Sequence, residues 1–386
     1  MTKKSWQKIK LENIAENLDN KRVPVTKEKR SKGDIPYYGA TGIVDYIDDY
    51  IFDEELLLVG EDGADWSSFA NTAYLVKGKS WVNNHAHVLR VIKANTSFLM
   101  EFLNYADLTL HTSGTTRGKL NKSDLMNLQI PLPDNTTQNK ISLLFTSLND
   151  QIIKTDQIIQ KTEILKQGLM KGLLVKGIDH TKFRKTKIGE IPESWKLAEL
   201  SEVASVERGK FSYRPRNEPR FYGGKIPFIQ TGDVVKSNGR ITTYSQTLNE
   251  QGLKISKLFR KGTIVLTIAA NIGDTGILEF DACFPDSLVG ITPTQELDTI
   301  YLEYFLRFRK DYLNSIATQS AQKNINLAKL NPMLIALPTL IEQKKIAEVL
   351  SSFDKKIAVE TMKKAKLVIL KKGLMQDIFS QRVQIN

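Results

Sequence analysis

The fold of this chain is decided by a segment that occurs twice. Leu132–Ile141 has the sequence LPDNTTQNKI, and Leu337–Ile346 has the sequence LPTLIEQKKI. When the comparison is extended, Leu120–Leu174 aligns with Ile325–Phe379 at a constant offset of 205 residues, without a gap and with 17 of 55 positions identical. Solenoid repeats have periods of about 20–50 residues. The longer period therefore indicates a duplicated module of domain size.

The sequence that precedes each copy is also related, but more weakly. Trp6–Ile14 resembles Trp195–Val203, and Ile35–Tyr38 resembles Ile226–Ile229. The chain of 386 residues is long enough for two to three domains. Its order is a variable module, a repeated module, a second variable module and a second repeated module.

Each repeated module is expected to be a long helix that begins after its proline. Apolar residues recur at alternating steps of three and four, which is typical of a coiled-coil seam. The predicted seam positions are Ile141, Leu144, Leu148, Ile152, Ile159, Leu165, Leu169 and Leu173 in the first copy, and Ile346, Val349, Phe353, Ile357, Leu367, Leu370, Leu374 and Ile378 in the second. Polar residues interrupt the seam at Thr155, Thr162, Glu360 and Lys364.

A helix of about 35–40 residues would be roughly 50–60 Å long. Because neither helix is stable in water with its apolar stripe exposed, we expect the two copies to pair antiparallel within the chain. Pairing between two chains is the alternative.

The variable modules are expected to contain mainly short strands. Candidate buried strands are Leu56–Val59, Val88–Ile92 and Thr263–Ile268, while Phe98–Tyr105 and Tyr301–Phe308 have the pattern of short helices. The predicted fold class is therefore α+β, with two mixed, mainly β modules separated by two long helices that pack as an antiparallel coiled coil.

The charge of the chain indicates a polyanionic partner. The net charge is +12 and the isoelectric point is near 9.4, which favours nucleic acid, with solubility alone as the alternative. The single cysteine, Cys283, excludes an internal disulfide and a cysteine-based zinc cluster. No apolar run approaches the length of a membrane span, and the charged first residues do not resemble a secretory signal, so we expect a cytoplasmic protein.

The sequence has none of the motifs expected of a self-sufficient DNA enzyme. Gly114–Leu120 has the wrong spacing for a phosphate-binding loop, and Gly78-Lys79-Ser80 lacks the upstream glycine. His85 and His87 would share one face of a strand, but a catalytic zinc site needs three protein ligands. Hydrogen bonding or packing is therefore the preferred interpretation of both histidines, and metal binding is the alternative. The acidic segment Glu61–Asp65 is interpreted as a polar turn, with cation binding as the alternative. We expect no metal in the chain.

The combined pattern resembles the specificity subunit of Type I restriction–modification systems. The resemblance rests on the two Leu-Pro-x-x-x-x-Gln-x-Lys-Ile phrases, on Ile191–Trp195 at the join, and on the alternation of modules, and it covers essentially the whole chain. It implies target-recognition domains at residues 1–133 and 181–338, and helical spacers at residues 134–180 and 339–386. Each recognition domain would read one half of a split, asymmetric DNA target, and the helices would set the gap between the halves.

The same resemblance implies partners and a division of labour. Two modification subunits would bind S-adenosylmethionine and methylate adenine, while restriction subunits would use ATP and Mg for translocation and cleavage. The chain itself would hold no cofactor and would not be catalytic. A duplicated module would offer two equivalent docking surfaces. The residues expected to pack the helices or to dock the partner subunits are Gln138, Ile141, Leu148, Ile152, Gly168, Leu169, Gln343, Ile346, Phe353, Ile357, Gly373 and Leu374.

Gly168 and Gly373 reduce helix stability. Close approach of two helices at these glycines is one interpretation, and a packing accident is the other.

DNA contacts are expected from polar and basic loops of the variable modules. Ser113–Lys119 aligns with Thr318–Asn324, Tyr38–Gly42 matches Gln230–Asp233, and a basic, aromatic-bearing stretch that includes Arg216 is expected only in the second variable module. Solvated loops without a DNA contact are the alternative. The candidate DNA contacts are Tyr38, Thr41, Thr115, Thr116, Arg117, Lys119, Arg208, Lys210, Tyr213, Arg214, Thr231, Gln319, Ser320, Gln322, Lys323 and Asn324.

Two other functional classes stay open at this point. A self-sufficient DNA enzyme would methylate or cleave DNA alone, which the lack of catalytic motifs in the sequence disfavours. A basic scaffold would bind DNA without sequence preference, which the divergence of the two variable modules disfavours.

Overall fold

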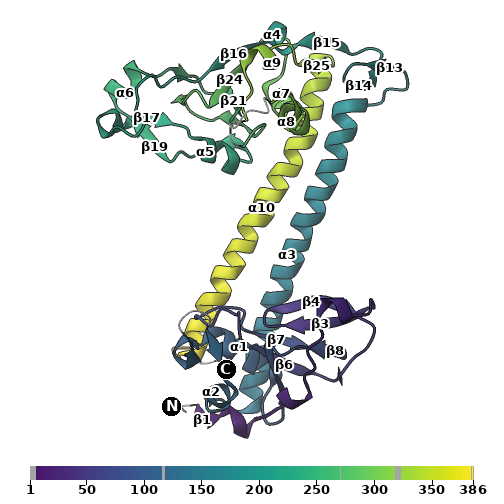
Figure 1. The fold of residues 1–386 in the computed structure, drawn as a ribbon, viewed down its shortest axis with the longest axis vertical. Coiled ribbons are helices and arrows are strands. Elements are labelled where there is room, and N and C mark those ends of the chain that lie inside the picture. The colour runs from purple at the N-terminus through teal and green to yellow at the C-terminus, as the bar shows by residue number, and fades with distance from the viewer. Residues whose placement is uncertain (1–5, 115–117, 270, 318–322, 384, 386) are drawn as a thin grey trace. The chain divides into compact units, whose positions relative to one another are not determined.

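The computed structural model describes all residues except 1–5, 115–117, 270, 318–322, 384 and 386. The chain divides into two compact units. Unit 1 comprises Met1–Ile158 and Glu360–Asn386, and unit 2 comprises Ile159–Val359. Each unit therefore contains one variable module and one segment from each of two long helices (Figure 1). In the part of the chain that the model describes, no helix combines the length and the apolar character needed to cross a membrane.

The two expected long helices are confirmed. Helix α3 spans Asn135–Lys176 (42 residues) and helix α10 spans Leu340–Phe379 (40 residues). Each begins two positions after the proline of its repeated phrase. The side chain of Asp134 accepts a hydrogen bond from the Thr137 amide (3.0 Å), and the Thr339 hydroxyl accepts one from the Glu342 amide (3.3 Å). These N-terminal caps explain why both helices start at that point.

Within each unit the segments of α3 and α10 pack against each other. In unit 1, Ile141 and Phe145 share a core with Met375 and Phe379, and Asp156 pairs with Lys364. The partner number on α10 falls as the residue number on α3 rises, so the two segments run antiparallel in this unit.

Unit 2 shows the same arrangement with the two helices exchanged. Leu174 shares a core with Ile346 and Leu350, and Lys166 Nζ lies 2.5 Å from Asp354 Oδ1. The segments are again antiparallel. The repeat in the sequence therefore produces the same helix packing in both units.

Part of the predicted seam is wrong. Four predicted seam residues are substantially exposed: Leu165 (60%), Leu169 (39%), Val349 (37%) and Leu370 (50%). The buried face instead includes Lys166 and Leu350, while Thr155 and Thr162, the predicted polar seam positions of the first copy, are buried. A lysine can occupy such a position because its long aliphatic stem packs while its ammonium meets a carboxylate. The apolar pattern alone therefore predicts Leu165 and Val349 as buried, whereas the buried residues are the next ones along the helix, Lys166 and Leu350.

Unit 1 contains two four-stranded sheets. The first has the order β2-β9-β6-β7 and the second the order β4-β3-β8-β5. The strands are β2 (Ala15–Asn17), β9 (Ala86–Val91), β6 (Leu56–Gly60), β7 (Ala73–Val76), β4 (Gly42–Ile47), β3 (Ile35–Gly39), β8 (Lys79–Val82) and β5 (Phe52–Asp53). Helix α1 (Thr96–Tyr105) covers the first sheet, and Leu57, Leu89 and Leu99 lie in the core between them. The predicted strands at Leu56–Val59 and Val88–Ile92 and the predicted helix at Phe98–Tyr105 are confirmed.

Unit 2 has the sheet orders β16-β24-β21-β22-β18 and β19-β17-β23-β20. The strands are β16 (Ala204–Arg208), β24 (Leu288–Pro293), β21 (Ile264–Thr267), β22 (Thr275–Leu278), β18 (Gly239–Ile241), β19 (Gln246–Leu248), β17 (Tyr222–Phe228), β23 (Ala282–Cys283) and β20 (Leu258–Phe259). Helix α7 (Thr299–Phe308) packs on the five-stranded sheet through Tyr301 and Phe305. Cys283 is buried.

The remaining elements are short. They are β1 (Gln7–Lys10), β10 (Thr112–Ser113), β11 (Lys119–Leu120), α2 (Lys122–Met126) and β12 (Gln129–Leu132) in unit 1, β13 (Phe183–Thr186), β14 (Gly189–Pro192), β15 (Lys196–Glu199), α4 (Leu200–Val203), α5 (Thr231–Lys236), α6 (Glu250–Lys254), α8 (Lys310–Ile316), α9 (Leu327–Leu330) and β25 (Leu334–Leu337) in unit 2, and the 3-10 turns η1 (Leu11–Asn13), η2 (Asp19–Lys21), η3 (Lys27–Lys29), η4 (Thr109–His111) and η5 (Pro219–Phe221). The pairs β1–β12 and β15–β25 are equivalent, because each joins the start of a variable module to the strand before a long helix.

Candidate nucleic-acid interface

In unit 2 the predicted basic stretch begins at the end of β16. Arg208 is half-buried, and its Nη2 donates hydrogen bonds to Asn324 Oδ1 (3.2 Å) and to the backbone oxygen of Ile325 (3.3 Å). The structure thus brings together two candidate residues that are more than a hundred positions apart in the chain. Lys210 and Lys323 are exposed, so their ammonium groups are accessible to phosphate.

Two arginines of this stretch share one carboxylate. Arg214 Nη2 lies 3.2 Å from Asp286 Oδ2, and Arg216 pairs with the other oxygen of Asp286. Both guanidinium groups are about half exposed. One carboxylate balances only one of the two positive charges, so the pair keeps a net positive charge. Such a group suits a phosphate, which accepts bidentate hydrogen bonds from guanidinium.

Aromatic rings support the same stretch. The rings of Tyr213 and Phe221 lie 4.8 Å apart between centroids. The guanidinium of Arg220 lies 4.7 Å from the Tyr213 ring and 4.8 Å from the Phe221 ring. These cation–π contacts hold an exposed arginine in place without neutralising it.

A cavity of about 190 Å³ connects this stretch to the second predicted loop. Gln230 lies directly before Thr231, the first residue of α5, and its Nε2 donates to Gln246 Oε1 (3.0 Å). Side-chain amides can both donate to and accept from base edges. The cavity is lined by Phe211, Arg216, Asn217, Tyr222, Phe228, Gln230, Gln246 and Pro285.

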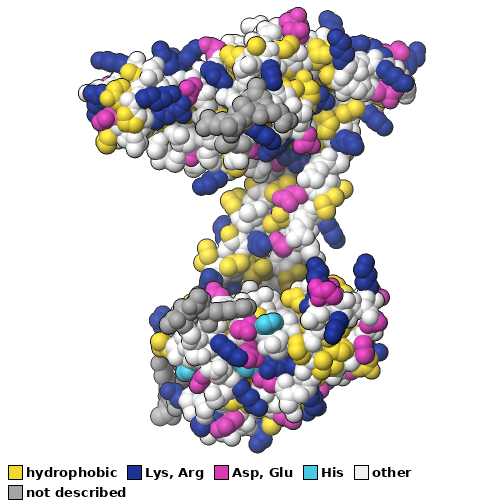
Figure 2. Space-filling view, in the orientation of Figure 1, with side chains coloured by type: hydrophobic (Ala, Val, Ile, Leu, Met, Phe, Trp, Pro, Cys, Tyr) yellow, Lys and Arg dark blue, Asp and Glu magenta, His cyan; other side chains and the backbone are white. Residues whose placement is uncertain are grey.

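Unit 1 also has a basic segment, which lies directly before β3. This place is equivalent to that of the basic stretch of unit 2, which lies before β17. The segment of unit 1 contains no aromatic residue, so a stretch that is both basic and aromatic-bearing is found only in the second variable module, as expected. Between Lys21 and Lys32, six of twelve residues are Lys or Arg, namely Lys21, Arg22, Lys27, Lys29, Arg30 and Lys32. This density was visible in the sequence, but without aromatic residues it did not match the pattern of the second module. Lys and Arg side chains are visible on both units in the face drawn in Figure 2.

The segment is fixed to the sheet of unit 1 by its less exposed members. The Arg30 guanidinium lies 4.3 Å from the Tyr37 ring centroid, and Arg30 Nη1 lies 2.9 Å from Asp45 Oδ2. The Tyr37 hydroxyl accepts a hydrogen bond from the Val25 amide (3.1 Å). Lys27, Lys29 and Lys32 stay exposed. The result is a row of ammonium groups on an ordered backbone.

Two predicted loop residues of unit 1 differ in exposure. Thr41 is exposed in the turn between β3 and β4. Tyr38 is half-buried and packs against Tyr74, with 5.9 Å between ring centroids. Burial and the neighbouring Tyr46 raise the pKa of Tyr38. Tyr38 therefore supports the turn, and Thr41 is the accessible member of the pair.

Several candidate contacts fall outside the described residues. These are Thr115, Thr116, Arg117, Gln319, Ser320 and Gln322.

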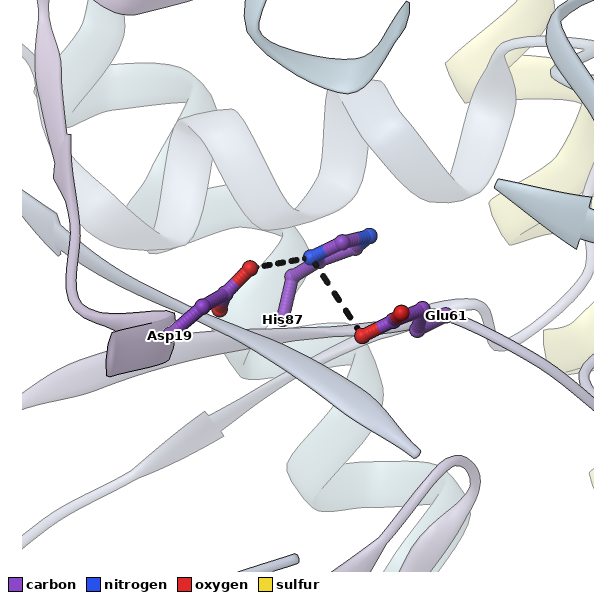
Figure 3. A group of neighbouring side chains, drawn as sticks. All are labelled: Asp19, Glu61 and His87. Carbon is purple, nitrogen blue, oxygen red and sulfur yellow. Dashed lines mark hydrogen bonds and ion pairs between the residues drawn. The ribbon is translucent and has the colours of Figure 1, made fainter. Parts of the chain in front are cut away.

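His87 belongs to a buried network with Asp19 and Glu61 (Figure 3). His87 Nδ1 lies 2.6 Å from Asp19 Oδ2 and 3.8 Å from Glu61 Oε2, and its Nε2 lies 2.7 Å from the backbone oxygen of Leu120. The three side chains each offer one ligand atom within 4.8 Å of the others, which is a spacing that a cation could use. Arg22 pairs with Glu61, and Lys119 Nζ lies 3.0 Å from Glu61 Oε1. These cations already balance the carboxylates.

The pKa values agree with an ion network. Burial alone would raise the pKa of Asp19, but hydrogen bonding and charge from His87 hold it below its usual value. Burial acts on Glu61 in the same way, and its bonds to Arg22 and Lys119 lower its pKa. The preferred interpretation of His85 and His87 as hydrogen-bonding residues therefore agrees with the structure, since His85 Nδ1 also lies 2.6 Å from Asp62 Oδ1. The network fixes Lys119 and Leu120 at the end of a predicted DNA-contact loop.

The two repeated glutamines do not lie on a surface. Gln138 and Gln343 are each 1% exposed. The amide of Gln138 donates to the backbone oxygen of Pro133 (2.8 Å) and accepts from the Asn95 amide (2.8 Å). Gln343 donates to Pro338 (3.0 Å) in the equivalent way and accepts from the Asp298 amide (2.8 Å). Each glutamine therefore fastens a long helix to the first turn of α1 or α7, and its use as a docking surface is ruled out.

Among the other predicted packing residues, Leu169 is exposed, and the rest fall into two groups. Buried or half-buried members pack inside the units, as expected: Ile141, Leu148, Ile152, Ile346, Phe353, Ile357 and Leu374. Gly168 and Gly373 are exposed, and a Cβ added to either would have no neighbour within 4 Å. The close approach of helices at these glycines is therefore wrong for the chain itself.

Comparisons with known proteins agree with this architecture. A family model described as the Type I restriction modification DNA specificity domain matches residues 3–163 and 192–368. A putative type I restriction enzyme specificity subunit of Haemophilus influenzae is 29% identical, with 89% of this chain and 86% of the relative covered. The MjaVIII specificity subunit of Methanocaldococcus jannaschii is 24% identical, with 98% and 93% covered.

A solved structure shows the same fold. The S subunit of a type I restriction–modification system from M. genitalium superimposes with a TM-score of 0.67 at 14% identity, with 100% of this chain and 98% of that chain covered. Both variable modules and most of both long helices lie inside the matched family ranges. The chain therefore belongs to the family of DNA sequence-specificity subunits of Type I restriction–modification systems.

Proposed function

We propose that unit 1 and unit 2 each read one half of a bipartite, asymmetric DNA target. The observation that carries this proposal is the pair of basic segments at equivalent places in the two units. The segment before β3 is rich in lysine, whereas the segment before β17 contains Arg214, Arg216 and Arg220 beside aromatic rings. Two equivalent but chemically different surfaces suit two different half-sites.

The long helices would set the gap between the half-sites. Each variable module is fastened to both helix segments of its unit. In unit 1, Lys371 Nζ lies 2.8 Å from Glu101 Oε2 on α1, and Asn149 donates to Glu101 Oε1 (2.7 Å). In unit 2, Tyr304 on α7 donates to Asp354 (2.5 Å), which also pairs with Lys166. A helix of about 40 residues is roughly 60 Å long, which is longer than one DNA turn of about 34–36 Å.

Catalysis would belong to partner subunits. Two modification subunits that bind S-adenosylmethionine would methylate adenine, and restriction subunits that use ATP and Mg would join them. The two units expose equivalent apolar side chains: Ile164 and Leu165 in unit 2 correspond to Ile369 and Leu370 in unit 1. Exposed apolar pairs at repeated positions suit two copies of one partner. Because the proposed target is DNA, we place the complex in the cytoplasm.

Mapping of methylated adenines tests the proposal. The chain and its modification subunit would be produced together in cells without other adenine methylation. We expect a split motif with a fixed gap. Replacing Lys10–Gln129 with the variable module of another family member should change one half of the motif and leave the other half unchanged. A contiguous motif, or a change in both halves, would refute the proposal.

A further inference from the structure

The hairpin formed by β3 and β4 carries an unusual surface. Residues Ala40 and Thr41 form its turn, Gly39 faces Gly42, and Tyr38 faces Ile43. Strand β4 is at the end of its sheet order and therefore has one unpaired edge. Its side chains Ile43 (48%), Val44 (53%) and Tyr46 (52%) are about half exposed.

Apolar side chains on a sheet edge favour unwanted association, and charged residues are the usual protection. The one charged side chain of β4 is Asp45. Arg30 binds it at 2.9 Å, and the hydrogen bond from Arg30 lowers the pKa of Asp45. Its charge is therefore balanced, and β4 presents a neutral, apolar strip. Arg30 belongs to the basic segment and connects that segment to β4 through its ion pair with Asp45. Lys27, Lys29 and Lys32 of the same segment are exposed.

The tip of the hairpin is held by contacts from behind. The Tyr74 hydroxyl donates to the backbone oxygen of Gly39, and its ring packs on Tyr38. A Cβ at Gly39 would lie 2.9 Å from Val44 Cγ1, so only glycine allows Val44 to take this position without a shift. The apolar side chains are therefore presented on an ordered backbone, which lowers the entropy cost of binding.

A neutral apolar strip beside lysines matches one feature of duplex DNA. The major groove admits a two-stranded β-ribbon, and the C5-methyl group of thymine is the apolar group on its floor. Phosphates border the groove on both sides and attract lysine. We propose that the β3–β4 hairpin enters the major groove, where Ile43 and Val44 contact thymine methyl groups in the half-site that unit 1 reads. This inference rests on the proposed function and names the chemical group that is read.

Unit 2 provides an internal comparison. Its equivalent strand, β17, pairs with β19, in which Thr247 faces Pro227 and Gln246 faces Phe228. Since Tyr46 faces Pro36 and Asp45 faces Tyr37 in unit 1, Thr247 and Gln246 take the places of Tyr46 and Asp45, and the exposed Tyr46 has a polar counterpart in unit 2.

The test removes the methyl group from the DNA and its contact from the protein. After the motif has been mapped, each thymine of both half-sites is replaced singly by deoxyuridine in synthetic duplexes. Binding of the complex of this chain with its modification subunit is measured by fluorescence anisotropy at one fixed salt concentration. With the unaltered chain, at least one replacement in the half-site of unit 1 should weaken binding about three- to fivefold, the effect of one buried methyl-sized group.

The variants Ile43→Ala and Val44→Ala should bind the thymine duplex more weakly by a similar factor and should no longer distinguish thymine from deoxyuridine at that position. Ile92→Ala is the matched control, because Ile92 is an equally exposed side chain of unit 1 (56%) outside the hairpin. It should bind like the unaltered chain. Since Ile43 and Val44 are exposed, both variants should fold, which circular dichroism and assembly with the modification subunit can verify.

Three outcomes overturn the inference. One is a half-site of unit 1 that contains no A·T pair. Another is equal binding of thymine and deoxyuridine duplexes at every position. The third is that the alanine variants bind DNA like the unaltered chain but differ from it in self-association or in subunit assembly. This result would show that the strip contacts protein and not DNA. In each case a split motif that follows module exchange would still stand, so failure of the proposed function is recognised separately.

Discussion

Gln343 offers a direct test of how the second recognition module is joined to its helices. The side chain is 1% exposed and makes three hydrogen bonds to backbone groups: it donates to Pro338 (3.0 Å) and Glu296 (3.1 Å) and accepts from Asp298 (2.8 Å). Gln343→Ala removes all three and leaves the buried backbone oxygen of Pro338 and two part-buried backbone groups without this partner. A net hydrogen bond contributes about 1 kcal/mol, and an unsatisfied buried group costs about 1–3 kcal/mol. We expect a loss of about 3–5 kcal/mol in the free energy of unfolding of unit 2.

Urea denaturation and thermal melting measure this loss. For a unit of this size, each 1 kcal/mol lowers the melting temperature by roughly 2–4 °C, so a fall on the order of 10 °C is expected. Gln157→Ala is the matched control, because Gln157 is exposed on α3, and it should leave the melting temperature unchanged. Gln138→Ala should destabilise unit 1 in the equivalent way. A loss below about 0.5 kcal/mol for both buried glutamines would refute the idea that they fasten the modules to the helices.

Three further predictions follow from the surfaces and the ion network. Arg216→Ala should weaken DNA binding and reduce the slope of log affinity against log salt by about one, because one phosphate contact is lost; an unchanged slope would remove Arg216 from the interface. The pKa values of Asp19 and Glu61 are lowered in the fold, so the stability they contribute is present above their usual pKa values near 4 and is lost as the pH falls through the still lower folded values. Urea melts between pH 7 and pH 3 should show that Glu61→Gln lowers stability at pH 7 and flattens this acid loss, and an equal acid loss in both proteins would contradict the account. Ile164→Glu and Ile369→Glu should each remove one modification subunit from the complex, as mass photometry can show, and retention of both subunits in both variants would exclude this docking surface.

Local features explain which parts of the fold were predictable. The prolines at positions 133 and 338 and the spacing of apolar residues predict both long helices, because caps and periodicity act over a few residues. The face of those helices was mislocated at Leu165 and Leu169, since Lys166 occupies the buried face through its ion pair with Asp354. The spacing of apolar residues cannot predict that a lysine is buried when the carboxylate that pairs with it lies on another helix.

The site was predictable only in part, for a related reason. The charge of the chain and the paired loops predict where DNA would bind, but the sequence does not predict the network of Asp19, Glu61, His87 and Lys119, which joins residues from four separate segments. The repeated glutamines were expected to pack the helices or to dock partner subunits, and their burial agrees with packing. Their real partners are the first turns of α1 and α7, which the sequence does not place beside them.

The central claim is that the two long helices fix the distance between the half-sites, and a matched shortening of both helices tests it most directly. Deleting Thr155–Lys161 from α3 and Val359–Ala365 from α10 removes seven residues from each helix and both partners of the Asp156–Lys364 pair. Seven residues nearly preserve the helix face and shorten each helix by roughly 10 Å, which corresponds to about three base pairs at 3.4 Å each. Mapping of methylated adenines should then show both half-motifs unchanged with a gap about three base pairs shorter. Methylation at the original gap, or at several different gaps, would contradict the claim.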